Sequence, residues 1–498
     1  MNTPRRRSGL ALLIRATSSL GAAMLLALVA TGCARPAHFA DRDRPTPGRP
    51  PNIVLIISDD LGYAEVGCYG QKLIKTPNID ALAALGTRFT NAYSGSCVCA
   101  PSRCTLLTGL HTGHAAIRDN KELNPVGQEP LPAESITIAH LLKQRGYTTA
   151  AIGKWGLGPP GSTGDPAKQG FDSFFGYLCQ RHAHNHCPPF LYRNSEVVSL
   201  PGNKERWDSG SVVVGAQYAP DLFRNEAEKF ISDNRSRPFF LLFATPVPHL
   251  ALQVPDDSLS EYKGLLPDTP YDGKKGYLKH DSPRAAYAAM VTRMDRDIGH
   301  LLARLRDLGL QDNTIVIFTS DNGPTFTGGT DSSFFESAAG FRGLKCQLYE
   351  GGIRVPLIIS QPGTIRQNTV SHAATGNWDL LPTIAHLAGI AAPSLPSNLD
   401  GIDLSPQLLT GEPLPPREHL YWEYASGGGW QAVRLGDFKG VRRNASKAPH
   451  VPIEIYNLST DPAEKVNIAP QHPDIARRMD QIMASRTPSP IVEWNFSP

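Results

Sequence analysis

The chain has 498 residues, a length that predicts one large domain with an appendage or more than one domain. Its formal net charge is +3 and 19% of its residues are charged. The basic excess of a nucleic-acid-binding protein or of a polybasic membrane patch is therefore missing. We expect no nucleic-acid partner, and the substrate has to be inferred from the residues of the site.

Residues 1–33 have the layout of a signal peptide, with Arg5-Arg6-Arg7 ahead of an apolar run from Leu20 to Ala30. Small residues directly before Cys33 resemble a bacterial lipobox, in which this cysteine becomes the lipid-modified N-terminus and ties the protein to a membrane. A plain secretory signal is the alternative, and the residues around the arginines fit a twin-arginine signal poorly. We expect an exported lipoprotein of the bacterial periplasm or outer membrane.

Residues 34–50 are rich in proline and arginine and lack apolar periodicity, so they predict a linker. A large domain is predicted over residues 51–390. It begins with Asn52–Ile57, a continuous β-branched run typical of a central parallel strand covered on both faces. Asp59 and Asp60 follow at the carboxyl end of this strand.

Strands and helices are predicted to alternate through the rest of the large domain. A helix from Pro77 to Leu85, capped by Gly86, is followed by helices over 137–145 and 284–308 and by strands over 148–152, 239–244, 314–319 and 355–359. This alternation predicts an α/β sandwich with a mostly parallel sheet. In the longest helix a stripe of apolar residues at intervals of three and four should cover that sheet: Val291, Met294, Ile298, Leu301, Leu305 and Leu308.

The composition changes near Ala391, where proline-rich connections separate short apolar segments. We expect a smaller C-terminal α+β subdomain over residues 391–498. Its predicted elements are short segments around 420–424, 432–435, 438–442 and 453–456 and a final helix over 473–483.

The stretch from Cys99 to Gly109 has the pattern of a nucleophile at the start of a helix. Pro101 suits the first helical position, which would place Cys99 where unpaired backbone N–H groups and the helix dipole favour an anion. A metal cluster of Cys97, Cys99 and Cys104 is rejected, because no second ligand pair accompanies them and Cys104 would point away along the helix. Disulfides among the other cysteines are permitted in an oxidising compartment.

Polar groups follow four of the predicted strands: Asp59-Asp60, Lys154, His249 and Asp321-Asn322. Ligands of open α/β sheets bind outside the carboxyl ends of the strands, so these groups are expected to converge. Taken one at a time, the acidic residues could be helix caps and the histidine could be an ordinary core or surface residue. Together, their carboxylate and amide oxygens predict a calcium or magnesium site, because hard oxygen ligands suit these ions and not zinc.

The string Cys99-Ala100-Pro101-Ser102-Arg103, followed after three residues by Leu107-Thr108-Gly109, resembles the sulfatase signature C-x-P-S-R and L-T-G. The chain is similar to type I, formylglycine-dependent, arylsulfatase-like sulfatases over residues 51 to 465. This resemblance implies an alkaline-phosphatase-like fold and the conversion of Cys99 to formylglycine by a maturation enzyme. It also implies that Ca²⁺ or Mg²⁺ is held at Asp59, Asp60, Cys99, Asp321 and Asn322.

The resemblance further implies roles for four other residues. Arg103, Lys154 and Lys345 would offset the charge on a transferring sulfuryl group, and His249 would protonate the leaving oxygen as general acid. The expected reaction is hydrolysis of a carbohydrate or aryl sulfate ester to alcohol and sulfate through a formylglycine-sulfate intermediate. Substrate choice is expected to lie in loops 159–189 and 255–279.

One departure from the family pattern matters. The usual G-K-W-H-L-G, whose histidine acts as base to release sulfate, here reads G-K-W-G-L-G with Gly156 in place of the histidine. The run from Gln180 to His186 resembles a Q-x-x-A-H stretch of sulfatases that share this glycine, and His184 is our candidate for the base. Its alternatives are a substrate-contacting or structural histidine cluster or a weak metal site.

Two rival functions remain open from the sequence. Related proteins use the same nucleophile and metal set on phosphorus, so a phosphonate or phosphate ester hydrolase is the nearest rival. The other is a sulfated-glycan-binding lipoprotein that has lost turnover through Gly156.

Overall fold

The computed structural model describes residues 48–124, 126–204, 215–446 and 451–496. The predicted signal peptide, including Cys33, and residues 34–47 of the predicted linker lie outside these ranges. The described residues all belong to one compact unit. Within the described part of the chain, every helix is too short or too polar to span a membrane.

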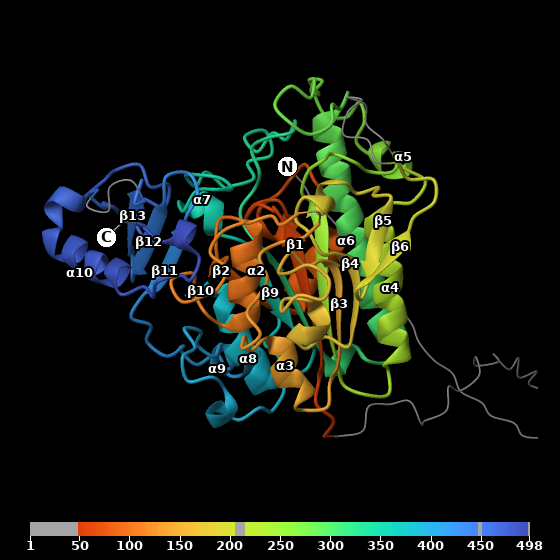
Figure 1. The fold of residues 1–498 in the computed structure, drawn as a ribbon, viewed down its shortest axis with the longest axis horizontal. Helices are drawn as coiled ribbons and strands as arrows, with labels where there is room; N and C mark the ends of the chain where they lie inside the picture. The colour runs from red at the N-terminus through yellow and green to blue at the C-terminus, as the bar shows by residue number, and fades with distance from the viewer. Residues whose placement is uncertain (1–47, 125, 205–214, 447–450, 497–498) are drawn as a thin grey trace, which may run out of the picture. The chain divides into compact units, whose positions relative to one another are not determined.

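A ten-stranded sheet runs through the centre of the fold (Figure 1). Its central run of neighbours, β8-β1-β7-β3-β4, is parallel throughout, and antiparallel pairs occur where β9 joins β8 to β2 and at the β4-β5-β6 edge. In spatial order the strands are β10 (Thr369–Gly376), β2 (Gly86–Tyr93), β9 (Leu357–Ser360), β8 (Thr314–Ser320), β1 (Asn52–Asp59), β7 (Phe239–Pro248), β3 (Thr148–Lys154), β4 (Ser173–Tyr177), β5 (Phe190–Arg193) and β6 (Glu196–Ser199).

Helices cover both faces of this sheet, as the alternation of elements predicts. Successive residues of β1 point to opposite faces: Val54 and Ile56 contribute to one core, and Ile53, Leu55 and Ile57 to the other. The helices that precede residue 391 are α1 (Pro77–Ala84), α2 (Cys99–Thr108), α3 (Ile138–Lys143), α4 (Ala219–Asp233), α5 (Asp256–Leu259), α6 (Pro283–Asp307), α7 (Glu350–Ile353) and α8 (Leu380–Leu387).

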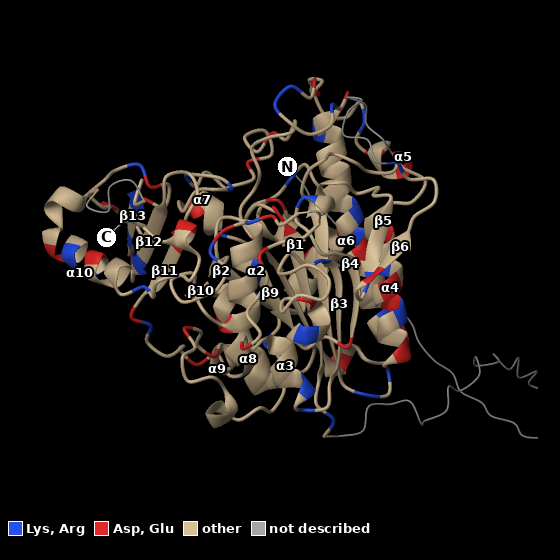
Figure 2. Ribbon diagram, in the orientation of Figure 1, with Lys and Arg blue, Asp and Glu red and all other residues tan. Residues whose placement is uncertain are grey.

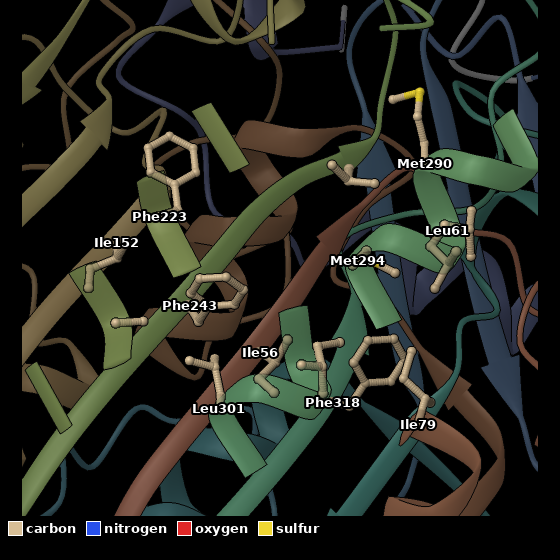
Figure 3. Close-up of a cluster of buried hydrophobic side chains, with 14 of the residues drawn as sticks. Ile56, Leu61, Ile79, Ile152, Phe223, Phe243, Met290, Met294, Leu301 and Phe318 are labelled. Atoms are coloured by element: carbon tan, nitrogen blue, oxygen red, sulfur yellow. The ribbon is translucent and has the colours of Figure 1, made fainter. Parts of the chain in front are cut away.

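The longest helix, α6, lies on the sheet as its apolar stripe predicts. Met294 and Leu301 pack with Ile56, Phe243 and Phe318 from three neighbouring strands (Figure 3). The stripe ends at the helix terminus, because α6 stops at Asp307 and leaves the following leucine partly exposed. On the opposite face α2, α3 and α8 share a core with β1 and β7.

The prediction that Gly86 caps the first helix is wrong. The helix ends at Ala84, and Gly86 is the first residue of β2. A Cβ atom at Gly86 would lie 2.3 Å from the carbonyl oxygen of Ile359 on β9. The glycine therefore permits the close approach of β2 and β9 and does not act as a helix cap.

The C-terminal part holds a four-stranded antiparallel sheet, β11-β12-β13-β14, with α10 packed against it. Buried Lys439 on β13 connects this sheet to α7, because its Nζ donates to Glu350 Oε1 at 2.9 Å, and the same atom lies 3.1 Å from Glu464 Oε1. Basic and acidic residues are interspersed along α4 and α10 (Figure 2). The elements of this part are α9 (Ser405–Leu409), β11 (Leu420–Tyr424), β12 (Trp430–Leu435), β13 (Phe438–Arg443), β14 (Glu454–Asn457) and α10 (Pro473–Ala484).

Cysteines of the described residues are all free thiols. Cys179 and Cys187, which are near enough in sequence to close a small loop, are both buried and unpaired. Cys104 packs in the core shared by α2 and the sheet, as its position within the helix predicts.

Candidate active site

Four adjacent parallel strands deliver polar side chains to one edge of the sheet. Asp59 is the last residue of β1 and Lys154 the last of β3, whereas His249 directly follows β7 and Asp321 directly follows β8. Because β8, β1, β7 and β3 are neighbours, these groups meet as predicted. All of them are buried, with exposed fractions between 0 and 2%.

Cys99 lies at the start of α2, above this edge. The helix begins at Cys99 itself, since Val98 is still extended, so Pro101 is the third helical residue and not the first as predicted. Proline is tolerated there because N–H groups of the first turn have no partner within a helix. The N–H of Ala100 donates instead to Asn120 Oδ1 at 2.9 Å.

The Cys99 sulfur is surrounded by charged groups. Its Sγ atom lies 3.5 Å from Asp59 Oδ1, 3.4 Å from Lys154 Nζ and 3.7 Å from Lys345 Nζ. Burial raises the pKa of the Cys99 thiol far above its ordinary value, although both lysines oppose the shift. An unmodified Cys99 is therefore a protonated thiol and not the thiolate that acts as a nucleophile.

Each carboxylate of the cluster has its own cation. Lys154 Nζ donates to Asp59 Oδ2 at 2.5 Å, and Lys345 Nζ lies 2.7 Å from Asp60 Oδ1. Against the effect of burial, the charge of Lys154 holds the pKa of Asp59 well below its ordinary range. These pairs keep charge in the interior, where an unpaired carboxylate would be costly.

Arg103 binds the third carboxylate. Its Nη2 and Nε donate to Asp321 Oδ2 at 2.7 and 3.1 Å, and its Nη1 donates to the carbonyl oxygen of Lys154 at 2.6 Å. The guanidinium thus fixes both Asp321 and the backbone of Lys154. Its hydrogen bonds go to these two residues and not to Cys99, so it positions groups that touch the nucleophile.

The oxygen atoms of this cluster fit a hard divalent cation. Ligand atoms of Asp59, Asp60, Cys99 and His249 all lie within 4.8 Å of one another. Asn322 Nδ2 donates to Asp60 Oδ1 at 2.7 Å, which leaves Asn322 Oδ1 buried without a hydrogen-bond partner. A buried carboxamide oxygen among carboxylates is the type of atom that Ca²⁺ or Mg²⁺ would coordinate.

His249 and Lys345 form a hydrogen-bonded pair beside Cys99. His249 Nδ1 lies 2.8 Å from the carbonyl oxygen of Leu250 and so donates to it. Its Nε2 is therefore free to accept a hydrogen bond from Lys345 Nζ, 3.0 Å away. Burial and the charge of Lys345 lower the pKa of His249 well below its ordinary value.

Of the three clustered histidines, His184 is the one placed at the site. Its ring stacks on that of His249, with centroids 4.6 Å apart and planes at 17°. His182 packs against Tyr177 and Phe190 instead. His186 Nε2 lies 2.8 Å from the carbonyl oxygen of His249 and supports that residue from outside the cluster.

Tyr277 reaches the same place from the loop between α5 and α6. Its ring centroid lies 5.4 Å from that of His184 and 6.3 Å from that of His249. The sequence places this tyrosine in a loop expected to choose the substrate, but gives no signal for its contact with the histidines. The sequence also gives no signal for the contact of Asn120 with the start of α2, because a loop residue follows no periodic pattern.

A second histidine group lies apart from this cluster. The N–H of Gly113 donates to His111 Nδ1 at 3.1 Å, so the ring proton of His111 lies on Nε2, which faces Asp400 Oδ1 at 3.4 Å. His114 Nδ1 lies 2.9 Å from the same oxygen. Asp400 thus faces both rings, and ligand atoms of the three residues all lie within 4.8 Å of one another.

Comparison with known proteins identifies two matching family models. The model described as Sulfatase matches residues 51–390. A second model, described as the C-terminal part of N-sulphoglucosamine sulphohydrolase, matches residues 343–487.

Relatives resemble the chain over most of its length. Arylsulfatase A of Homo sapiens is 34% identical over 486 residues, covering 87% of each chain. The N-acetylgalactosamine-6-O-sulfatase of Bacteroides thetaiotaomicron is 28% identical over 524 residues, covering 91% of this chain and 96% of the relative. The crystal structure of Ps i-CgsB in complex with k-i-k-neocarrahexaose superimposes with a TM-score of 0.74 at 28% identity, covering 90% and 95% of the two chains.

Proposed function

This chain belongs to the sulfatase family, and from that premise we propose that it hydrolyses a carbohydrate or aryl sulfate ester through a formylglycine formed from Cys99. The observation that carries the proposal is the placement of Cys99 Sγ between Asp59, Lys154 and Lys345, at the edge where Asn322 Oδ1 has no partner. This arrangement surrounds one nucleophilic position with cations and with ligands for a divalent ion.

The raised pKa of the Cys99 thiol supports prior modification of this residue. Hydrated formylglycine carries two hydroxyl groups on one carbon. One oxygen bonds to sulfur while the bond from sulfur to the leaving oxygen breaks, and the leaving alcohol gains a proton. The second hydroxyl then loses its proton, the C=O bond forms again and sulfate departs with the electron pair of the C–O bond.

Charged residues of the cluster supply the other parts of this reaction. Lys154 and Lys345 flank residue 99 and offset charge on the sulfuryl group, while the Lys345–His249 pair holds a proton for the leaving oxygen. When bound, Ca²⁺ or Mg²⁺ would polarise the sulfate oxygens and favour loss of the nucleophile's proton. Asp59, Asp60, Asp321 and Asn322 are the residues that would hold it.

His184 is our proposed base for sulfate release. Burial and the charges of Lys154 and Lys345 lower its pKa to about 3, so the ring is neutral at physiological pH and has a free lone pair. A bound anionic sulfate ester offsets those lysine charges and makes the ring a better proton acceptor. The stack of its ring on that of His249 supports this role.

Substitution of His184 tests this assignment. We expect His184→Asn to release about one equivalent of alcohol and then stop, because the ester on residue 99 forms but is not cleaved. His182→Asn is the matched control, since that ring packs on Tyr177 and Phe190. A burst assay and the mass of the residue-99 peptide report the result. Unchanged steady-state sulfate release by His184→Asn would contradict the assignment.

Sulfated sugar is the substrate class best supported for this site. The Bacteroides relative is named for a sulfated amino sugar, and Ps i-CgsB is in complex with k-i-k-neocarrahexaose. We also propose export as a lipoprotein, with a lipid on Cys33, supported by the signal-peptide layout of residues 1–33.

Paired substrates test the reaction class. Sulfate, phosphate and phosphonate esters of one chromogenic alcohol are compared with the same preparation of modified protein. We expect the highest kcat/KM with the sulfate ester. Preference for a phosphorus ester would favour the rival hydrolase, and binding of sulfated sugar without sulfate release would favour the rival binding protein.

A further inference from the structure

Gly156 and Gln180 occupy one small volume beside the active site. Gly156 stands two residues after Lys154, the lysine that contacts Cys99 Sγ. A Cβ atom at Gly156 would lie 1.9 Å from Gln180 Nε2 and 2.7 Å from Gln180 Cδ. A side chain at position 156 and the carboxamide of Gln180 therefore exclude each other.

The carboxamide of Gln180 is buried without hydrogen bonds. The residue is 6% exposed, and neither Nε2 nor Oε1 has a partner. Among the residues that the structure describes, no other asparagine or glutamine side chain has both polar atoms buried and unpaired. Burying an amide in this state costs free energy, and native proteins pair such groups with protein, water or ligand.

The surrounding backbone holds this amide at the catalytic edge of the sheet. Lys154 pairs with Tyr177 across β3 and β4, and the N–H of Trp155 donates to the carbonyl oxygen of Tyr177 at 2.9 Å. Gly156 and Gln180 leave the sheet just beyond these residues. Four residues after Gln180, His184 stacks on His249.

We propose that Gln180 is a catalytic residue whose carboxamide hydrogen-bonds the hydroxyl and sulfate oxygens on residue 99, in the space that the family's histidine fills at position 156. This inference rests on the proposed function of the site. A carboxamide has a donor and an acceptor but cannot take a proton at neutral pH. Gln180 therefore orients the hydroxyl of the sulfated residue, while His184 accepts its proton.

This assignment predicts opposite effects on stability and on catalysis. Gln180→Leu keeps the volume and removes a buried unpaired amide, so the midpoint of urea unfolding should stay the same or rise. Loss of the hydrogen bonds to residue 99 should lower kcat for sulfate release 10- to 100-fold with less than a threefold change in KM. The sulfated form of the residue-99 peptide should accumulate at steady state.

Gln431→Leu is the matched control. This buried glutamine of β12 donates its Nε2 hydrogens to Tyr421 and to the carbonyl oxygen of Met483, in the C-terminal sheet. Its loss should lower the unfolding midpoint and leave kcat and the residue-99 peptide unchanged. A buried glutamine with a structural role is expected to behave in this way.

The outcomes separate this inference from the proposed function. If the wild-type protein with formylglycine at position 99 releases no sulfate from sulfate esters, the proposed function fails. If the wild type is active and Gln180→Leu keeps the wild-type kcat, the role of Gln180 is overturned. The role is also overturned if Gln180→Leu loses stability, as the control does, and accumulates no sulfated peptide. Lower kcat with unchanged or higher stability and accumulation of that peptide supports it.

Discussion

The Cys99→Ala variant is expected to lose sulfate-releasing turnover by about 10⁴-fold or more, because residue 99 carries the atom that bonds to sulfur. Folding should survive, since alanine is smaller than the buried thiol and the charged groups around it keep their pairs. Initial rates of sulfate release, measured beside the midpoint of thermal unfolding, check both statements.

Cys104→Ala is the control for this substitution. Cys104 lies in the same helix but packs in the core against the sheet. It should lose some stability to the cavity and keep turnover within a few-fold. Comparable turnover by Cys99→Ala and wild type would show that another group attacks the substrate.

Removal of the divalent cation is expected to lower turnover about 10³-fold, which corresponds to about 4 kcal/mol of transition-state stabilisation. Three buried carboxylates and the unpaired Asn322 Oδ1 supply hard ligands, so Ca²⁺ or Mg²⁺ should restore activity and Zn²⁺ should not. Chelation followed by elemental analysis and a turnover assay provides the measurement.

Unfolding gives a second readout of the ion. A ligand that binds the folded state at 100 times its Kd stabilises it by about 2.7 kcal/mol, so the unfolding midpoint should rise with Ca²⁺ concentration. The Asn322→Leu variant removes the unpaired oxygen and should weaken this dependence. Full turnover by protein shown to contain no divalent metal would contradict the predicted site.

Long buried elements were predictable because their sequence pattern is strong. The β-branched run beginning at Asn52 forms β1, and the apolar stripe of α6 covers the sheet. The short strands β5 and β6 could not be predicted from the sequence, because each has only four residues and several side chains of β6 are exposed. Pairing with a neighbouring strand, rather than local pattern, decides their conformation.

In the candidate site, too, residues at strand ends were predictable and residues in loops were not. Asp59, Lys154 and Asp321 were predicted to meet because strand ends in a parallel sheet converge at one edge. Tyr277 and Gln180 come from loops whose path depends on tertiary packing. The glycine at position 156 was visible in the sequence, but the side chain that fills its space was not.

The most direct test of the formylglycine mechanism compares the chemical state of residue 99 with activity in the same preparations. Protein is expressed with graded amounts of a formylglycine-generating enzyme, and the residue-99 peptide is quantified by mass spectrometry beside the initial rate of sulfate release. We predict a rate proportional to the formylglycine fraction, with none when every molecule carries cysteine. Sulfate release by protein that carries only cysteine at position 99 would contradict the mechanism.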